Sequence, residues 1–209
     1  MTGLYMTAVH IDIIHGDHFI REAESPPVDL DRIVDPAAAA RVVPGGQSAK
    51  LHWLLERPTY IVASQGDPKL VDAATGAILP PPTQADIRRL AEDRFTGEQK
   101  LVGVQLIHDL PSEIRGREPP VWRVDFDGWN KPTLYFSPAT GELLTRRHEL
   151  WRVFDLFWTM HIMDYRTRDN VNNWLIQPFN WGALLLLLSG AWLLLYSFGR
   201  RGRKAGKGP

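Results

Sequence analysis

Apolar positions follow two different patterns along this chain. Through about the first 150 residues they form short runs, several of them alternating, broken by glycine and proline. Residues 181–198 instead form a run of eighteen residues without a formal charge. As a helix this run would be roughly 27 Å long, close to the thickness of the hydrocarbon core of a bilayer. The pattern predicts a folded region followed by a transmembrane helix; a buried core helix is the alternative.

The flanks of the long run carry the signals of a membrane anchor. Trp181, Trp192 and Tyr196 lie at or near its ends, where amphipathic rings favour the headgroup region. Residues 199–209 add five cations and no acid, among them Arg200, Arg201 and Arg203. Because basic segments stay in the cytoplasm, we expect a cytoplasmic C-terminus and a large domain outside. In a bacterium this means the inner membrane, with the domain in the periplasm.

The shorter apolar runs predict two successive units of similar order. In residues 35–82, Asp35 and Pro36 begin a helix, and strands follow at 49–56, 59–64 and 69–72. In residues 83–148, Thr83 and Asp86 form the helix start. Its strands are expected at 101–108, 121–127 and 134–136. Residues 21–34 read as a linker.

A repeated turn supports this duplication. Ala74-Thr75-Gly76 recurs as Ala139-Thr140-Gly141, 65 positions later. The sequence therefore predicts an α+β fold of two αβββ repeats with antiparallel sheets.

Composition narrows the classes of function. The 24 basic and 24 acidic residues balance, but five of the cations lie in the tail, so the remainder is mildly acidic without a basic patch. This argues against nucleic-acid binding. The absence of cysteine excludes disulfides, thiolate metal sites and cysteine nucleophiles. Because no nucleophile elbow, zinc-protease, phosphate-loop or dinucleotide motif is present either, we expect no enzyme.

Residues 149–166 predict an amphipathic helix between the repeats and the anchor. Its apolar face would hold Leu150, Phe154, Phe157, Trp158, His161 and Tyr165. Arg152 and Asp155 exclude a simple membrane span. We expect the helix to lie flat on the bilayer or to pack between domain and anchor, with Trp158, His161, Asp164 and Tyr165 at the interface.

Histidines are the only candidate cofactor ligands. His161 could be an axial haem ligand, paired with His10 if their helices meet; otherwise it is a packing residue. His15 and His18, three positions apart, could share a helix face and bind a metal with Asp17 nearby. Capping at a solvated helix end is the alternative.

Three segments resemble the PepSY-associated transmembrane proteins. Residues 71–76 (VDAATG) are similar to the D-x-x-T-G turn of PepSY domains, and residues 158–166 (WTMHIMDYR) resemble the W-x-x-H-x-M-D-Y-R segment of that family. Residues 3–7 (GLYMT) through 16–18 resemble the exit of its first membrane helix. The resemblance implies that residues 1–20 end a first membrane helix and that the chain is N-terminally shortened. Relatives include iron-uptake reductases that look like haem proteins.

Three hypotheses of function follow. The first is a non-enzymatic periplasmic PepSY protein, an accessory or regulatory subunit that binds a partner protein at the inner membrane. The second is a haem-binding redox component of an iron-uptake or electron-transfer system. The third is a protease modulator, because PepSY units also occur in protease propeptides.

Overall fold

A computed structural model describes residues 11–21, 26–168 and 170–205. The chain divides into two compact units. The first, called here the α+β unit, is Val9–Val153, and the second, the C-terminal unit, contains Phe154–Pro209. Each is described by itself.

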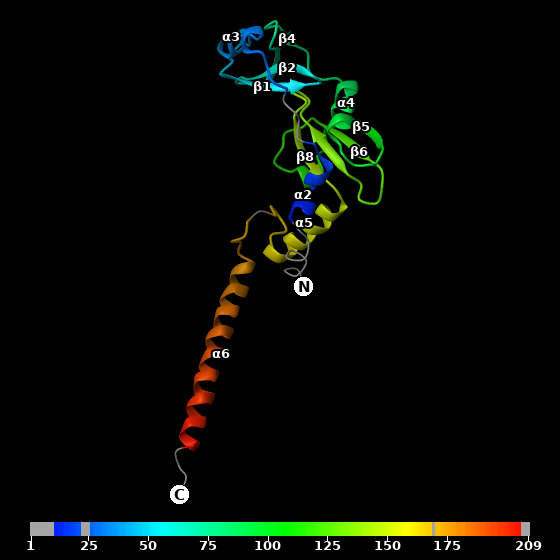
Figure 1. The fold of residues 1–209 in the computed structure, drawn as a ribbon. Helices are drawn as coiled ribbons and strands as arrows, with labels where there is room; N and C mark the ends of the chain where they lie inside the picture. The colour runs from blue at the N-terminus through cyan, green and yellow to red at the C-terminus, as the bar shows by residue number, and fades with distance from the viewer. Residues whose placement is uncertain (1–10, 22–25, 169, 206–209) are drawn as a thin grey trace. The chain divides into compact units, whose positions relative to one another are not determined.

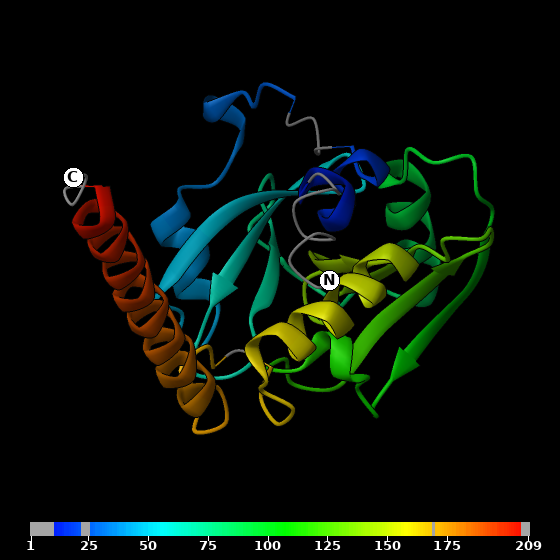
Figure 2. The same cartoon turned by 90° about the horizontal axis from the view of Figure 1, so that it is seen from below.

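The first half of the α+β unit is a helix followed by a four-stranded sheet (Figure 1). The helix is α3 (Pro36–Val42), and the strands are β1 (Ser48–Leu54), β2 (Arg57–Ala63), β3 (Lys69–Asp72) and β4 (Ile78–Leu79). The strands are antiparallel in the order β1-β2-β3-β4. As predicted, Asp35 caps α3, since its carboxylate accepts from Ala37 N at 2.8 Å and Ala38 N at 3.1 Å. Figure 2 shows α3 beside the cyan strands of this sheet.

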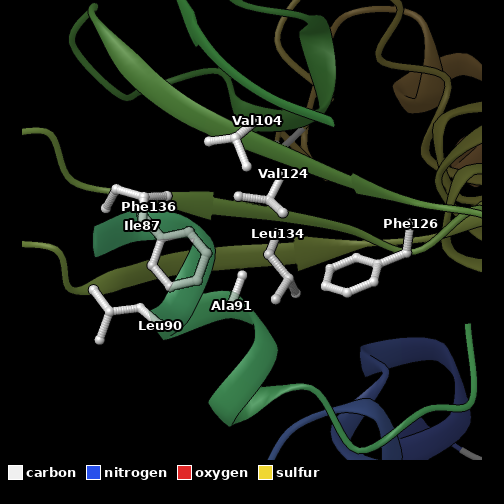
Figure 3. Packing of buried hydrophobic residues seen from close by; sticks show 8 residues of the cluster. All are labelled: Ile87, Leu90, Ala91, Val104, Val124, Phe126, Leu134 and Phe136. Carbon is white, nitrogen blue, oxygen red and sulfur yellow. The ribbon is translucent and has the colours of Figure 1, made fainter. Parts of the chain in front are cut away.

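The second half repeats that order. It consists of α4 (Gln84–Arg94), β5 (Leu101–Ile107), β6 (Val121–Phe126), β7 (Thr133–Phe136) and β8 (Leu143–Arg147), again antiparallel in sequence order. Thr83 and Asp86 form the predicted capping box at α4. Ile87, Leu90 and Ala91 then lie on one face of α4 and pack against the sheet (Figure 3).

The predicted α+β class and antiparallel sheets are confirmed, but three strands for each unit is wrong. Each sheet has a fourth strand, β4 or β8, directly after the repeated turn. The two turns share their backbone bonds: Gly76 N donates to Asp72 O, and Gly141 N to Ser137 O, both at 2.9 Å. Both glycines have a positive φ, 72° and 70°, which side chains disfavour. Each turn therefore folds the chain back onto its sheet as an edge strand.

The β1–β2 hairpin joins the two halves. Its turn is Leu55-Glu56, with φ values of 48° and 66°, two residues before the gap between the expected strands 49–56 and 59–64. Leu54 and Leu55 at this tip pack against the core between α4 and the second sheet. The first sheet thus contributes side chains to the core of the second repeat.

Residues 108–120 give the second sheet a covered outer face. They contain the short helix η3 (Ser112–Ile114), and Ile114 packs there with Val121 and Tyr135 in a separate buried cluster. The corresponding turn in the first repeat has only two residues between β1 and β2. The second repeat therefore has buried apolar groups on both faces of its sheet.

Residues 11–20 form α2 (Ile11–His15) and η1 (Asp17–Phe19), and η2 (Leu30–Arg32) follows. Ile14 is buried, and Ile20 pairs with Phe95 after α4. The first ten residues lie outside the described part, so the predicted end of a first membrane helix stays a prediction.

The C-terminal unit contains most of α5 (Glu149–Ile162) and all of α6 (Ile176–Ala205). Among the described residues, one helix is long and apolar enough to cross a bilayer. This is α6 at Ile176–Tyr196, with a mean hydropathy of 1.6 and no part buried inside the structure. This candidate span thus has the predicted place, starting five residues before residue 181.

Candidate functional site: helix α5 and its junction with α6

The first turn of α5 is fully hydrogen-bonded by the α+β unit. Asn130 accepts from Glu149 N through its carbonyl at 2.8 Å and from Leu150 N through Oδ1 at 3.2 Å. His148 accepts from Trp151 N through Nδ1 at 3.3 Å. Because the first N–H groups of a helix have no partner within it, these bonds fix where α5 begins.

Arg152 attaches α5 to the loop that precedes β6. It reaches both oxygens of Glu113, from Nε to Oε2 at 2.7 Å and from Nη2 to Oε1 at 3.1 Å. Tyr135 donates to the same carboxylate at 2.6 Å. Burial by itself would raise the pKa of Glu113, but the hydrogen bonds from Arg152 and Tyr135 outweigh it and lower that pKa. The carboxylate therefore stays ionised and joins helix, loop and sheet.

Arg147 strengthens the same attachment. Its Nε donates to Glu113 O at 3.0 Å, and its guanidinium lies 4.0 Å from the centre of the Trp151 ring. A cation over an aromatic face is attracted by the ring.

His148 is a buried histidine at the start of α5. Its Nδ1 accepts a hydrogen bond, so the neutral ring carries its proton on Nε2. Nε2 makes no hydrogen bond within the described residues, although the carbonyls of Ile13 and Ile14 favour the protonated ring slightly. Burial dominates and lowers the pKa of His148 below its ordinary value.

The C-terminal half of α5 has its own inward polar groups. Asp155 pairs with Arg168 at 2.8 Å, and their side chains are only 13% and 33% exposed. Thr159 is buried and donates back to Asp155 O at 2.7 Å. The loop after α5 is thus folded onto the helix by a partly buried ion pair.

Asp164 organises that loop. Its carboxylate accepts from the backbone N–H groups of Arg166, Thr167 and Asn170 at 3.0–3.1 Å and from the Thr167 hydroxyl. The Thr167 hydroxyl and these N–H groups lower the pKa of Asp164 against the effect of burial. The helix itself ends at Ile162, before the predicted residue 166, because Met163 has a φ of 54° that stops it.

Asn173 links the two helices of the C-terminal unit. Its Nδ2 donates to Ile162 O at the end of α5 at 2.7 Å. Its Oδ1 accepts from Leu175 N at 3.0 Å and Ile176 N at 3.1 Å, where α6 begins. One side chain therefore holds the last turn of α5 beside the first turn of the apolar helix.

The predicted interface residues occupy different positions along this segment. Trp158 is half-buried and stacks on Phe154 with ring centres 6.3 Å apart. Asp164 is buried, whereas His161 and Tyr165 are exposed. The predicted apolar face is therefore only partly covered.

The haem prediction concerns His161 and His10. His161 is an exposed residue of α5, and His10 lies outside the described residues. The described part thus supplies one exposed imidazole, so haem binding stays a prediction.

The predicted metal pair is separated by a helix end. His15 is the last residue of α2, Gly16 follows with a φ of 71°, and His18 belongs to η1, so the two do not share one helical face. Asp17 forms an ion pair with Arg146. In the described ranges, no three His, Asp or Glu side chains are close enough to hold a metal ion.

The predicted membrane residues all lie on α6. Trp181, Trp192 and Tyr196 are exposed along the apolar stretch. The helix continues through Arg200, Arg201 and Arg203, whose side chains lie outside the described part.

A shallow depression of about 630 Å³ lies on the outer face of the second sheet. Its lining includes Val102, Gly128 and Lys131. Val102 is 67% exposed, and Trp129, in the β6–β7 loop, is 74% exposed. Val102 points outward because the register of β5 shifts between Leu101 and Gly103.

Sequence reasoning missed Glu113, Asn130 and Asn173, and it placed His148 at a helix start only as a surface or core histidine. The one signal in the sequence was that each is a polar residue in an expected loop or at a helix boundary. Polar side chains at such places often cap backbone groups.

Comparison with family models, curated proteins and solved structures found no match for this chain.

Proposed function

We propose that this chain is a membrane-anchored accessory protein without catalytic activity of its own. α6 would hold it in the bacterial inner membrane, with the α+β unit in the periplasm and the basic C-terminus in the cytoplasm. The observation that carries the proposal is the apolar stretch Ile176–Tyr196, which is long enough to span a bilayer and has no buried part among the described residues. The five cations beyond it support the orientation.

Anchoring and orientation are tested by two fusions to the full chain. A C-terminal green fluorescent protein should fluoresce and a C-terminal alkaline phosphatase should be inactive, because phosphatase folds only after export. The protein should also stay in the pellet after extraction of membranes with alkaline carbonate. An active C-terminal phosphatase would overturn the orientation, and release by carbonate would overturn the anchor.

We further propose that the α+β unit binds a partner protein. The resemblance of residues 71–76 to PepSY domains implies such an accessory role. The exposed Trp129 and Val102 support it, since aromatic residues are enriched in protein interfaces. Chemical crosslinking of intact membranes, followed by purification through a tag, should recover one protein in fixed proportion. Trp129→Ala should reduce that recovery, whereas Ile78→Ala, at an exposed apolar site on β4, should not. Equal recovery with both variants would remove Trp129 from the interface.

A further inference from the structure

Beyond its first residue, the exposed side of α5 is apolar, whereas a surface helix usually exposes its charges. Glu149 shares this side, is 40% exposed and pairs with Arg152. Val153, Leu156 and Met160 follow the spacing i, i+3, i+7 and are all exposed, Leu156 by 57% and Met160 by 47%. The charged Arg152 and Asp155 instead make ion pairs on the inward side. Val153, Leu156 and Met160 are called here the outer face of α5. A helix that turns its charges inward and its apolar residues outward is suited to a non-aqueous surface.

The connection to α6 indicates what that surface is. Asn173 binds the last carbonyl of α5 and the first N–H groups of α6 with the same amide. The end of α5 is therefore within one side chain of the point at which the apolar stretch begins. If Ile176 lies at the membrane boundary, Ile162 lies there too. The exposed Met160 is only two residues before Ile162, a rise of about 3 Å along the helix.

Aromatic residues surround this junction. Tyr165, Trp174, Phe179 and Trp181 are all exposed, Trp174 by 81%. Trp and Tyr favour the headgroup level of a bilayer because their rings are apolar and carry a polar group. Exposed aromatic side chains thus occur both after the end of α5 and in the first turns of α6.

We propose that α5 is a membrane-interface helix whose outer face inserts into the lipid at the boundary between headgroups and acyl chains, in the leaflet that α6 enters first. The proposal rests on the membrane anchoring proposed above. Lipid is the occupant because the outer face continues, through Asn173, into a helix suited to lipid, and because an amphipathic helix lying in the interface buries one apolar side. The inward ion pairs then hold the α+β unit and the connecting loop to a helix fixed in the membrane plane.

Absence of cysteine makes the test direct. Single cysteines replace Leu156 or Met160 in the full chain, are spin-labelled, and are reconstituted in vesicles of phosphatidylethanolamine and phosphatidylglycerol at about 3:1. Collision rates with oxygen, which concentrates in lipid, and with a water-soluble nickel chelate measure the depth of each label. Val102→Cys, an exposed apolar site of the α+β unit, is the aqueous control, and Leu187→Cys in α6 is the control for the hydrocarbon core.

The expected result is graded. Labels at Leu156 and Met160 should show an oxygen-to-nickel ratio several-fold above that at Val102 and below that at Leu187. A ratio equal to that at Val102, with Leu187 still deep, would overturn the interfacial role of α5 and leave the anchor intact. Aqueous values at all four positions would overturn the anchor and this proposal together. A nickel-inaccessible but oxygen-poor label at Leu156 would indicate burial by protein, and would also overturn the proposal.

Discussion

The two repeats of the α+β unit have the same order of elements but different surroundings. The first sheet packs one face against α3, a helix that consists mostly of alanine. Ala39 and Ala40 of α3 share a buried cluster with Tyr60 and Val62 of β2. The second sheet packs one face against α4 and covers the other with residues 108–120. The added loop supplies Glu113, and Glu113 holds α5. The two halves thus differ through one loop, and the half that contains it carries the connection to α6.

The first prediction tests whether the second core is the stronger one. Phe136→Ala, at a fully buried position of the cluster in Figure 3, should lower the free energy of unfolding by about 3–5 kcal/mol. Val62→Ala in the first core should cost about 1–3 kcal/mol, because fewer buried atoms are removed. Urea unfolding of the full chain in detergent, followed by tryptophan fluorescence, measures both. A larger loss for Val62→Ala would reverse the comparison.

The second prediction concerns the loop that distinguishes the repeats. Arg152→Ala should lower stability by about 2–4 kcal/mol, because it leaves Glu113 partly buried without its cation. The matched control is Lys50→Ala, which breaks the Lys50–Glu142 pair between the repeats at 3.1 Å. Since the Lys50 side chain is 74% exposed, its loss should cost only about 0–1 kcal/mol. Equal effects in the same unfolding assay would show that the Glu113 network does not hold α5.

That network also shows what the sequence could and could not predict. Asp35, Thr83 and the two Thr-Gly turns are local signals, since each is bonded within a few residues, and they were predicted correctly. The bonds of Arg152 to Glu113 join residues 39 positions apart, and no local pattern specifies such a pair.

The faces of α5 were harder to predict for a related reason. Periodicity indicates which residues share a side of a helix, and it places Phe154, Phe157 and Trp158 together correctly. It does not say which side is covered. In the structure, these residues of the predicted face are half-buried, and Arg152 and Asp155 are held in ion pairs. The exposed apolar residues of α5 are Val153, Leu156 and Met160, which the predicted face did not include. The bulge that turns Val102 outward is a similar case, because one extra residue in β5 inverts the alternation.

The third prediction is a pH dependence from His148. Its folded-state pKa is lower than the ordinary value of 6.5, so the unfolded chain binds a proton more readily. Stability is therefore complete above about pH 6.5 and falls as the pH drops below it toward the lowered pKa. Unfolding midpoints between pH 7.5 and 5.5 measure the loss. Burial also lowers the pKa of His52, which contributes in the same direction.

The control for this effect is His148→Asn, because Asn keeps an acceptor for Trp151 N but does not titrate. The variant should lose part of the acid sensitivity and keep the remainder from His52. An unchanged pH profile would show that His148 is not responsible.

The fourth prediction compares two glycines with the same φ. Gly16 and Gly45 both have a φ of 71°, where an L side chain costs about 1 kcal/mol. A Cβ at Gly45 meets nothing within 4 Å, but at Gly16 it comes within 3.0 Å of Cδ2 of His148. Gly16→Ala should therefore cost about 1 kcal/mol more than Gly45→Ala, since the buried ring has to move. Equal losses in urea unfolding would mean that α2 can shift away from His148 at little cost.

The last and smallest effect tests the repeated turns directly. In the first turn, Oδ1 of Asp72 accepts from Ala74 N at 2.9 Å and Thr75 N at 2.8 Å. In the second, Ser137 Oγ accepts only from Thr140 N, at 3.3 Å. Asp72→Ser should thus cost about 0.5 kcal/mol, the scale of one weakened side-chain cap, and Ser137→Asp should gain a similar amount. Stability changes of opposite sign for the two substitutions would show that the turns have the same backbone and differ only in this acceptor. A loss of stability from both would show that the surroundings of Ser137 differ as well.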